Sequence, residues 1–203
     1  MPDWLTQNPK MFSIWLDRNN LSQFPPELLE MPNLRVLRLN RNAITKLPAE
    51  LSKMTAIGQL DLGDNQISVL PPEVGHLANL TRLGLENNLL VELPPEIGDL
   101  ASLDCLVLSR NKLTSLPPEI GKLQRLDSLI LDNNLLRNLP VEISRLKSLR
   151  FLSLSGNPLS DEAKAKVEKL LPNTRIDYRG EPRRPGEETG KEEKAEDGPS
   201  DFR

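Results

Sequence analysis

The sequence of 203 residues predicts an α/β solenoid, in which a curved parallel sheet lines the concave face and short helical turns cover the convex face. Three observations lead to this fold class. An asparagine recurs every 23 residues, apolar and variable residues alternate shortly before each asparagine, and a segment with proline and glutamate follows. Repetition at a fixed period of this length indicates similar structural units that stack along one axis.

The segment before each asparagine is predicted to form a short strand. Leu37 and Leu39 enclose one variable residue in the second unit, and Leu129 and Leu131 do so in the sixth. Alternation with a period of two is typical of a strand that buries one face. Because every unit advances in the same way, we expect successive strands to lie parallel, about 4.8 Å apart.

The repeated asparagines are predicted to be structural. Each follows a strand where the chain turns inward, and its side-chain amide can both donate and accept hydrogen bonds. It can therefore satisfy backbone groups that the turn would otherwise bury without a partner. Stacking would align these residues in a ladder, whose seven members are Asn19, Asn42, Asn65, Asn88, Asn111, Asn134 and Asn157.

The second half of each unit predicts a helical turn. Its clearest form is Leu-Pro-Pro-Glu-Ile-Gly, as at residues 93–98. Proline fixes φ where a helix begins, and a glutamate in the first turn faces the positive end of the helix dipole. A metal-binding stripe is the alternative interpretation of the glutamate column, which consists of Glu27, Glu50, Glu73, Glu96, Glu119 and Glu142.

The chain divides into four predicted segments. They are a short amino-terminal cap (residues 1–10), seven repeat units (11–159), a capping helix with a strand stub (160–178), and a disordered charged tail (179–203). The tail contains no aliphatic residue larger than Ala195, so it cannot bury enough apolar surface to fold. It is interpreted as a solubilising segment or as a tether.

The two ends of the solenoid need cover, because apolar core is exposed wherever stacking stops. At the carboxyl end, Ser160 can cap a helix that Pro172 stops, and Ile176 fits a last strand. The amino-terminal cap offers only Trp4 and Leu5 as apolar cover. We therefore expect an amino-terminal edge that is exposed or covered by a partner.

Composition excludes several classes of partner. The formal net charge is −3 and aromatic residues make up 3% of the chain, which argues against nucleic-acid binding. No apolar run approaches a membrane span, and the first ten residues lack the features of a secretory signal. Cys105 is the one cysteine, so no intramolecular disulfide can form. These features predict a cytoplasmic protein without membrane insertion.

No catalytic, metal or cofactor site is predicted. The one histidine, His76, and Cys105 fall at different positions of their units, which puts them on opposite sides of the arc. Asp104 and Asp127 occupy equivalent positions in neighbouring units and could share a proton or a metal. However, Arg150 continues that column beside Asp127, so an ordinary ion pair is the competing interpretation.

The outward strand positions are where recognition is expected, because the scaffold fixes their spacing and leaves their identity open. The early units combine Trp15 with several arginines, and the guanidinium of Arg38 could lie over the Trp15 ring. The later units place an apolar group, rimmed by the charged residues Asp104, Asp132 and Arg110, on a face that should meet water, which indicates an interface. The alternative is that such residues only favour strand formation. The candidate binding residues are Trp15, Arg38, Arg41, Arg82, Cys105, Val107, Ile130 and Phe151.

The spacing Leu-x-x-Leu-x-Leu-x-x-Asn-x-Leu, as at residues 34–44, resembles leucine-rich repeat proteins over roughly residues 11–178. The period of 23 and the Leu-Pro-Pro-Glu-Ile-Gly segment are similar to the intracellular class, which includes Ras-group scaffold proteins, Ras-suppressor proteins and bacterial cytoplasmic homologues. The resemblance implies a non-enzymatic scaffold without cofactors that binds a protein such as a small GTPase or another signalling protein. A self-associating, architectural protein that assembles through the amino-terminal edge or the tail is the alternative.

Overall fold

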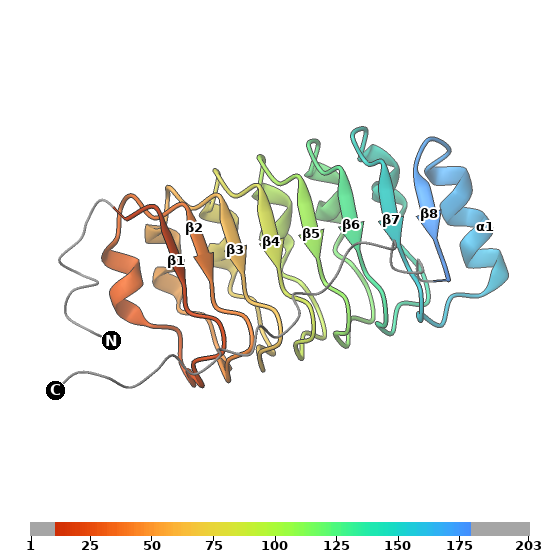
Figure 1. The fold of residues 1–203 in the computed structure, drawn as a ribbon. Helices are drawn as coiled ribbons and strands as arrows, with labels where there is room; N and C mark the ends of the chain where they lie inside the picture. Colours follow the sequence, from red (N-terminus) through yellow and green to blue (C-terminus); the bar gives the residue numbers. More distant parts are fainter. Residues whose placement is uncertain (1–10, 180–203) are drawn as a thin grey trace, which may run out of the picture.

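The computed structural model describes residues 11–179 as one open, curved sheet of eight parallel strands (Figure 1). The predicted amino-terminal cap and, apart from Arg179, the predicted charged tail lie outside the described residues. The strands follow one another in chain order: β1 (Ser13–Trp15), β2 (Val36–Arg38), β3 (Gln59–Asp61), β4 (Arg82–Gly84), β5 (Cys105–Val107), β6 (Ser128–Ile130), β7 (Phe151–Ser153) and β8 (Arg175–Asp177).

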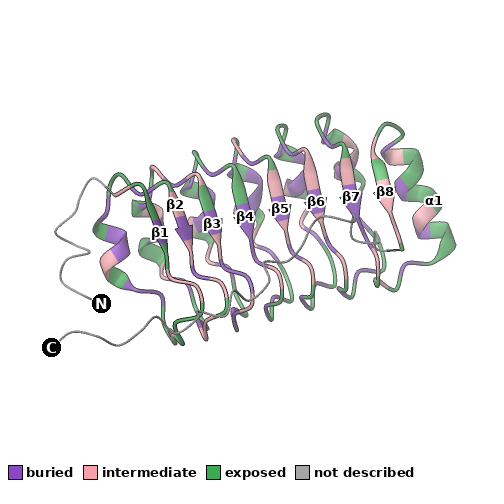
Figure 2. Cartoon of the chain, in the orientation of Figure 1, coloured by how far each residue is buried: buried purple, intermediate pink, exposed green. Residues whose placement is uncertain are grey.

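The strand register follows the sequence period. Leu37 of β2 pairs with Leu60 of β3, which pairs in turn with Leu83 of β4, 23 residues further along. At the last strand, Leu152 pairs with Ile176, so the final unit is one residue longer than the others. Every strand therefore points its central residue inward, and its flanking residues form the opposite face (Figure 2).

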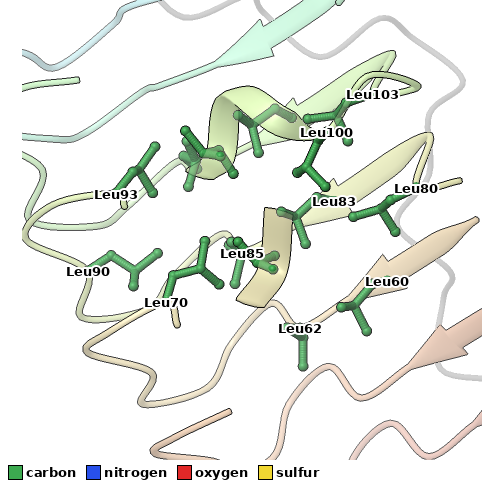
Figure 3. Close-up of a cluster of buried hydrophobic side chains, with 14 of the residues drawn as sticks. Leu60, Leu62, Leu70, Leu80, Leu83, Leu85, Leu90, Leu93, Leu100 and Leu103 are labelled. Carbon is green, nitrogen blue, oxygen red and sulfur yellow. The ribbon is translucent and has the colours of Figure 1, made fainter. Parts of the chain in front are cut away.

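The core is a stack of aliphatic side chains between the strands and the turns. Figure 3 shows that Leu60 and Leu62, Leu83 and Leu85 and their neighbours in adjacent units pack into continuous layers. Leu83 is fully buried, as are its equivalents on the neighbouring strands. Each unit covers the apolar surface of the next, so stability accumulates along the axis rather than around one centre.

The asparagine ladder satisfies the buried backbone of the inner turn. The Asn65 amide nitrogen Nδ2 donates to the carbonyl oxygens of Leu39 and Leu62, both at 3.0 Å, and Oδ1 accepts from the Ile44 amide at 3.0 Å. Asn88, Asn111, Asn134 and Asn157 repeat this pattern. Asn19 differs in that its Nδ2 donates to the carbonyl oxygen of Asp17, within its own unit.

Within residues 11–179, the convex side carries six short 3-10 helices. They are η1 (Pro26–Glu30), η2 (Ala49–Lys53), η3 (Pro72–His76), η4 (Pro95–Asp99), η5 (Pro118–Lys122) and η6 (Val141–Arg145). Each has a proline as its N-cap residue and a glutamate in its first turn. Glycines let neighbouring turns approach: a Cβ on Gly75 would lie 2.6 Å from the carbonyl oxygen of Glu96.

A ten-residue helix, α1 (Asp161–Leu170), follows the seventh unit. The Ser160 side chain accepts a hydrogen bond from the Ala163 amide at 3.1 Å and so caps its amino terminus. The hydroxyl of Tyr178 donates to the Lys164 carbonyl oxygen at 3.2 Å, which joins the end of β8 to this helix. None of the helices within residues 11–179 combines the length and apolar character that a membrane crossing requires.

Candidate functional site

The concave face is the surface formed by the outward residues of β1 to β7 and the residues that follow each strand. Two columns run along it, because residues 23 apart are register partners: one contains Trp15, Arg38, Asp61, Gly84, Val107, Ile130 and Ser153, and the other contains Ser13, Val36, Gln59, Arg82, Cys105, Ser128 and Phe151. The structure therefore puts seven of the eight candidate binding residues on the strands, and Arg41 lies just after β2.

An aromatic and cationic group begins the concave face. The Trp15 side chain is 68% exposed, and the guanidinium carbon of Arg38 lies 5.2 Å from the centroid of its ring. Nε of Arg38 also lies 3.3 Å from Oδ2 of Asp17 without hydrogen-bond geometry, so this pair is an ionic contact. Arg38 thus lies between a ring and a carboxylate, so Trp15 and Arg38 form one continuous surface.

The arginines of the early units are partly neutralised. Nε of Arg41 lies 3.4 Å from Oδ2 of Asp64, and Arg41 has a positive φ of 57° that holds its backbone in the left-handed region. Asp17 and Asp64 each offset one arginine, so this region is less basic than the sequence indicates. A hollow of about 460 Å³ lies here, lined by Asp17, Arg18, Arg38, Asn40, Arg41, Asp64 and Glu86.

The middle of the face is interrupted at Gly84, which is buried and leaves room for acidic side chains. Its hypothetical Cβ would lie 3.0 Å from Oδ1 of Asp61 and 3.2 Å from Oε2 of Glu86. Burial, and then the nearby charges of Asp61 and Asp64, raise the pKa of Glu86 above its ordinary value. Arg82 partly offsets this cluster, with Nε 3.4 Å from Oδ1 of Asp61.

The later half of the concave face is apolar and half-buried. Val107 and Ile130 are register partners on neighbouring strands, while Ser128 separates Cys105 from Phe151 in the other column. The guanidinium carbon of Arg175 lies 5.8 Å from the Phe151 ring centroid. The sequence predicts that this group is exposed, but the adjacent strands cover part of each side chain. Val107 and Ile130 therefore form a shallow, half-exposed apolar surface, which we call the apolar floor.

A second ladder, which sequence reasoning missed, runs beside the first. Oδ1 of Asp17 accepts from the Asn40 amide at 2.9 Å, and Oδ1 of Asn40 accepts from the Gly63 amide at 2.7 Å. In the later units, Oδ1 of Asp132 accepts from the Ser155 amide at 2.8 Å. Asp132, interpreted from the sequence as part of an interface rim, therefore has a structural role. Its signal was an aspartate or asparagine two residues before a ladder asparagine, as at Asp17, Asn40 and Asp132.

The side chains that could have suggested catalysis are separated or paired. Cys105 lies on β5 of the concave face and His76 lies in η3 on the convex side (Figure 1). Burial raises the pKa of the Cys105 thiol, which disfavours the nucleophilic thiolate. Asp127 forms an ion pair with Arg150 at 2.8 Å, and no three His, Cys, Asp or Glu side chains between residues 11 and 179 are grouped as a metal site would require.

Two valines outside the candidate binding residues are exposed at one lateral edge of the solenoid. Val69 is 66% exposed and Val91 is 49% exposed, and both line a groove of about 840 Å³ beside the proline segments of the third to fifth units. Val69 and Val91 occupy adjacent positions of the repeat, four and three residues after the ladder asparagine. A comparison of each position across the units would have found them, because the other units have polar residues there.

Two family models match the chain. The model described as a leucine-rich repeat region matches residues 82–172, and the model described as a leucine rich repeat matches residues 9–67 and 32–90. Together they extend over the unit pattern from the first unit to the capping helix. No curated protein sequence matches the chain at a significant level.

Solved structures with a similar fold include the following two. A leucine-rich repeat protein of Leptospira interrogans, LIC12759, is 36% identical with a TM-score of 0.68; the match covers 88% of this chain and 51% of that one. The second is the ectodomain of the Arabidopsis thaliana membrane receptor kinase GASSHO1/SCHENGEN3, in complex with CASPARIAN STRIP INTEGRITY FACTOR 2. It is 27% identical with a TM-score of 0.76, and the match covers 89% of this chain and 25% of that one. The chain thus spans about half the length of the Leptospira protein and about a quarter of the length of the plant ectodomain.

Proposed function

Because the chain belongs to the leucine-rich repeat family, we propose that it is a non-enzymatic scaffold whose concave face holds one folded protein. The single observation that carries this proposal is the apolar floor formed by Val107 and Ile130 between charged neighbours. The repeat frame does not require apolar residues at this position, because Arg38, Asp61 and Ser153 occupy it in other units. Half-exposed apolar side chains in such a setting favour a protein interface.

The first units supply a second contact of a kind that interfaces use. Trp15 and Arg38 stack on one another, and aromatic and arginine side chains are enriched among residues that dominate binding energy. Covering them would remove a large, pre-ordered surface from water at little entropic cost. A partner that spans β1 to β6 would therefore contact an aromatic anchor at one end and an apolar floor at the other.

The proposed partner is a signalling protein. The plant receptor ectodomain is in complex with CASPARIAN STRIP INTEGRITY FACTOR 2, which supports the view that a solenoid of this shape can hold a partner. The sequence resemblance favours a signalling protein such as a small GTPase. A cytoplasmic location also belongs to this proposal, supported by the unpaired thiol of Cys105.

Affinity capture with the full chain tests the concave face. The parent, the Val107→Asp/Ile130→Asp double variant and a matched Val141→Asp control, altered on an exposed convex residue, are immobilised and exposed to extract from the source cells. A protein that the parent and the control both retain is then purified. Its affinity for the double variant should be more than tenfold lower than for the parent, because two charges would be buried in the interface. Equal binding to all three would refute the concave site, provided that their circular dichroism agrees.

Self-association is a second candidate function, favoured by the amino-terminal edge. Phe12 is 58% exposed beside the exposed Trp15, and β1 pairs with β2 alone among the described strands. Sedimentation at several concentrations tests it: a size that increases with concentration and returns to that of a monomer in Phe12→Ser/Trp15→Ser would favour assembly. A monomer at all concentrations would exclude it.

A further inference from the structure

A groove on the lateral edge, distinct from the concave face, crosses three consecutive units. Its apolar wall consists of Val69, Val91, Pro72, Pro94, Pro95 and Pro117, and its volume is about 840 Å³. We name this surface the lateral groove. It lies after the asparagine ladder, where each unit leads into its 3-10 helix, so none of the concave columns contributes to it.

The two valines are not needed by the repeat. The two valines occupy the positions three and four residues after the ladder asparagine. Units without a groove valine have polar residues at both positions: Thr45 and Lys46, Thr114 and Ser115, and Arg137 and Asn138. Val69 and Val91 are the exceptions, they belong to neighbouring units, and both side chains remain largely in water. Exposed apolar residues that gather in one groove favour a binding role over a structural one.

The backbone along the lateral groove has unused hydrogen-bonding groups. The main chains of Val69 and Glu92 make no hydrogen bond with another described residue, whereas the Val91 carbonyl oxygen accepts from the Thr114 amide at 3.3 Å. An extended peptide carries free donors and acceptors along its length and can pair with such groups.

The charge of the groove selects among peptides. Glu92 and Glu96 line it, and neither forms an ion pair with a described cation. Glu73 and Glu119 hold the same position as Glu96 in the two adjacent turns and also have no described cationic partner. A row of unpaired carboxylates beside an apolar wall attracts lysine and arginine and repels acidic segments.

We propose that the lateral groove binds an extended segment of a partner protein in which apolar and basic residues alternate. Successive side chains of an extended chain point to opposite sides, so one set lies against Val69 and Val91 while the other reaches Glu92 and Glu96. This site goes beyond the concave face and provides the scaffold with a second, chemically different point of attachment.

A defined probe tests the lateral groove. The probe is a fluorescein-labelled octapeptide of alternating lysine and valine, and its binding to the full chain is followed by fluorescence polarisation. One comparison peptide has glutamate in place of lysine, and another has serine in place of valine. The parent should bind the probe saturably, more weakly at high salt, and at least tenfold more tightly than either comparison peptide.

Variants locate the binding. Val69→Ser/Val91→Thr introduces the polar residues of other units, and it should weaken probe binding at least tenfold, as should Glu92→Lys. Val141→Ser, altered at an equally exposed convex valine, should bind like the parent. Val107→Asp/Ile130→Asp should also bind the probe unchanged, so a failure of the concave-face function leaves this test intact.

Three results would overturn the proposal. The first is no saturable binding by the parent, and the second is equal binding by the Val69→Ser/Val91→Thr variant. The third is a parent that dimerises in sedimentation while this variant stays monomeric, because a second copy would then fill the groove.

Discussion

The side-chain nitrogen Nδ2 of Asn111 donates to the carbonyl oxygen of Leu85, 26 residues earlier, at 2.8 Å. The same nitrogen contacts the Leu108 carbonyl oxygen at 3.0 Å, and Oδ1 accepts from the Leu90 amide at 3.0 Å. One side chain thus joins the inner turns of neighbouring units, and it does so in a buried environment where water cannot substitute.

Asn111→Ala should therefore lower the free energy of unfolding by roughly 2 to 4 kcal/mol, since each buried backbone group left without a partner costs about 1 to 3 kcal/mol. Urea unfolding followed by far-ultraviolet circular dichroism measures the loss. Asn19→Ala is the matched control, because Asn19 is exposed and, among residues 11–179, its Nδ2 donates to the Asp17 carbonyl oxygen alone. Its cost should be below about 1 kcal/mol; equal losses at both positions would contradict the structural role of the ladder.

Gly98→Ala should destabilise the convex layer. The added Cβ would meet the backbone carbonyl oxygen and carbon of Glu119 in the next turn, and backbone atoms cannot move aside as a flexible side chain can. We expect a loss of about 1 to 3 kcal/mol in urea unfolding. Gly58→Ala is the control, since the nearest atom would lie 3.5 Å away, and a change within about 0.5 kcal/mol is expected. A tolerated Gly98→Ala would show that the turns are more loosely packed.

Glu86 should make stability fall as the pH rises. The pKa of its carboxyl group is raised above its ordinary value of 4.5, mainly by burial, so the folded state keeps this proton to a higher pH than the unfolded state. The free energy of unfolding must then decrease as the pH rises from about the ordinary value through the folded-state pKa. Relative to Glu86→Gln, the parent should lose stability over this interval in urea unfolding at stepped pH. The exposed Glu92→Gln serves as control, and a constant difference between parent and Glu86→Gln would contradict the burial argument.

Tyr178 should ionise late. Burial, and then the charge of Glu168, raise the pKa of this side chain to about 12. Because the chain contains one tyrosine, the ultraviolet absorbance of tyrosinate reports this residue alone. We expect a midpoint near pH 12 while circular dichroism remains native, and a return toward the ordinary value of 10.0 in urea. A midpoint near the ordinary value in the native state would mean that the β8 end does not pack against α1.

Much of the candidate site was predictable, but its interactions were not. The alternation in each unit predicts that Trp15, Arg82, Val107 and Ile130 face outward together, and their register partners on the sheet agree. The structural role of Asp132 was not predicted, because the donor of its hydrogen bond is a backbone amide of the next unit. A contact between side chain and backbone leaves no complementary residue type in the sequence, so residue identity alone points equally well to an exposed rim.

The sequence by itself determined the parallel sheet, the asparagine ladder and the convex turns, because each unit repeats the same local chemistry and stacking at a constant period follows from that repetition. The tertiary structure decided which variable side chains meet. Arg38 reaches both Trp15 and Asp17, and Gly84 opens space for Glu86. Val69 and Val91 share one groove for the same reason. These relationships depend on the distance and angle between neighbouring units, which arise only when all units pack together.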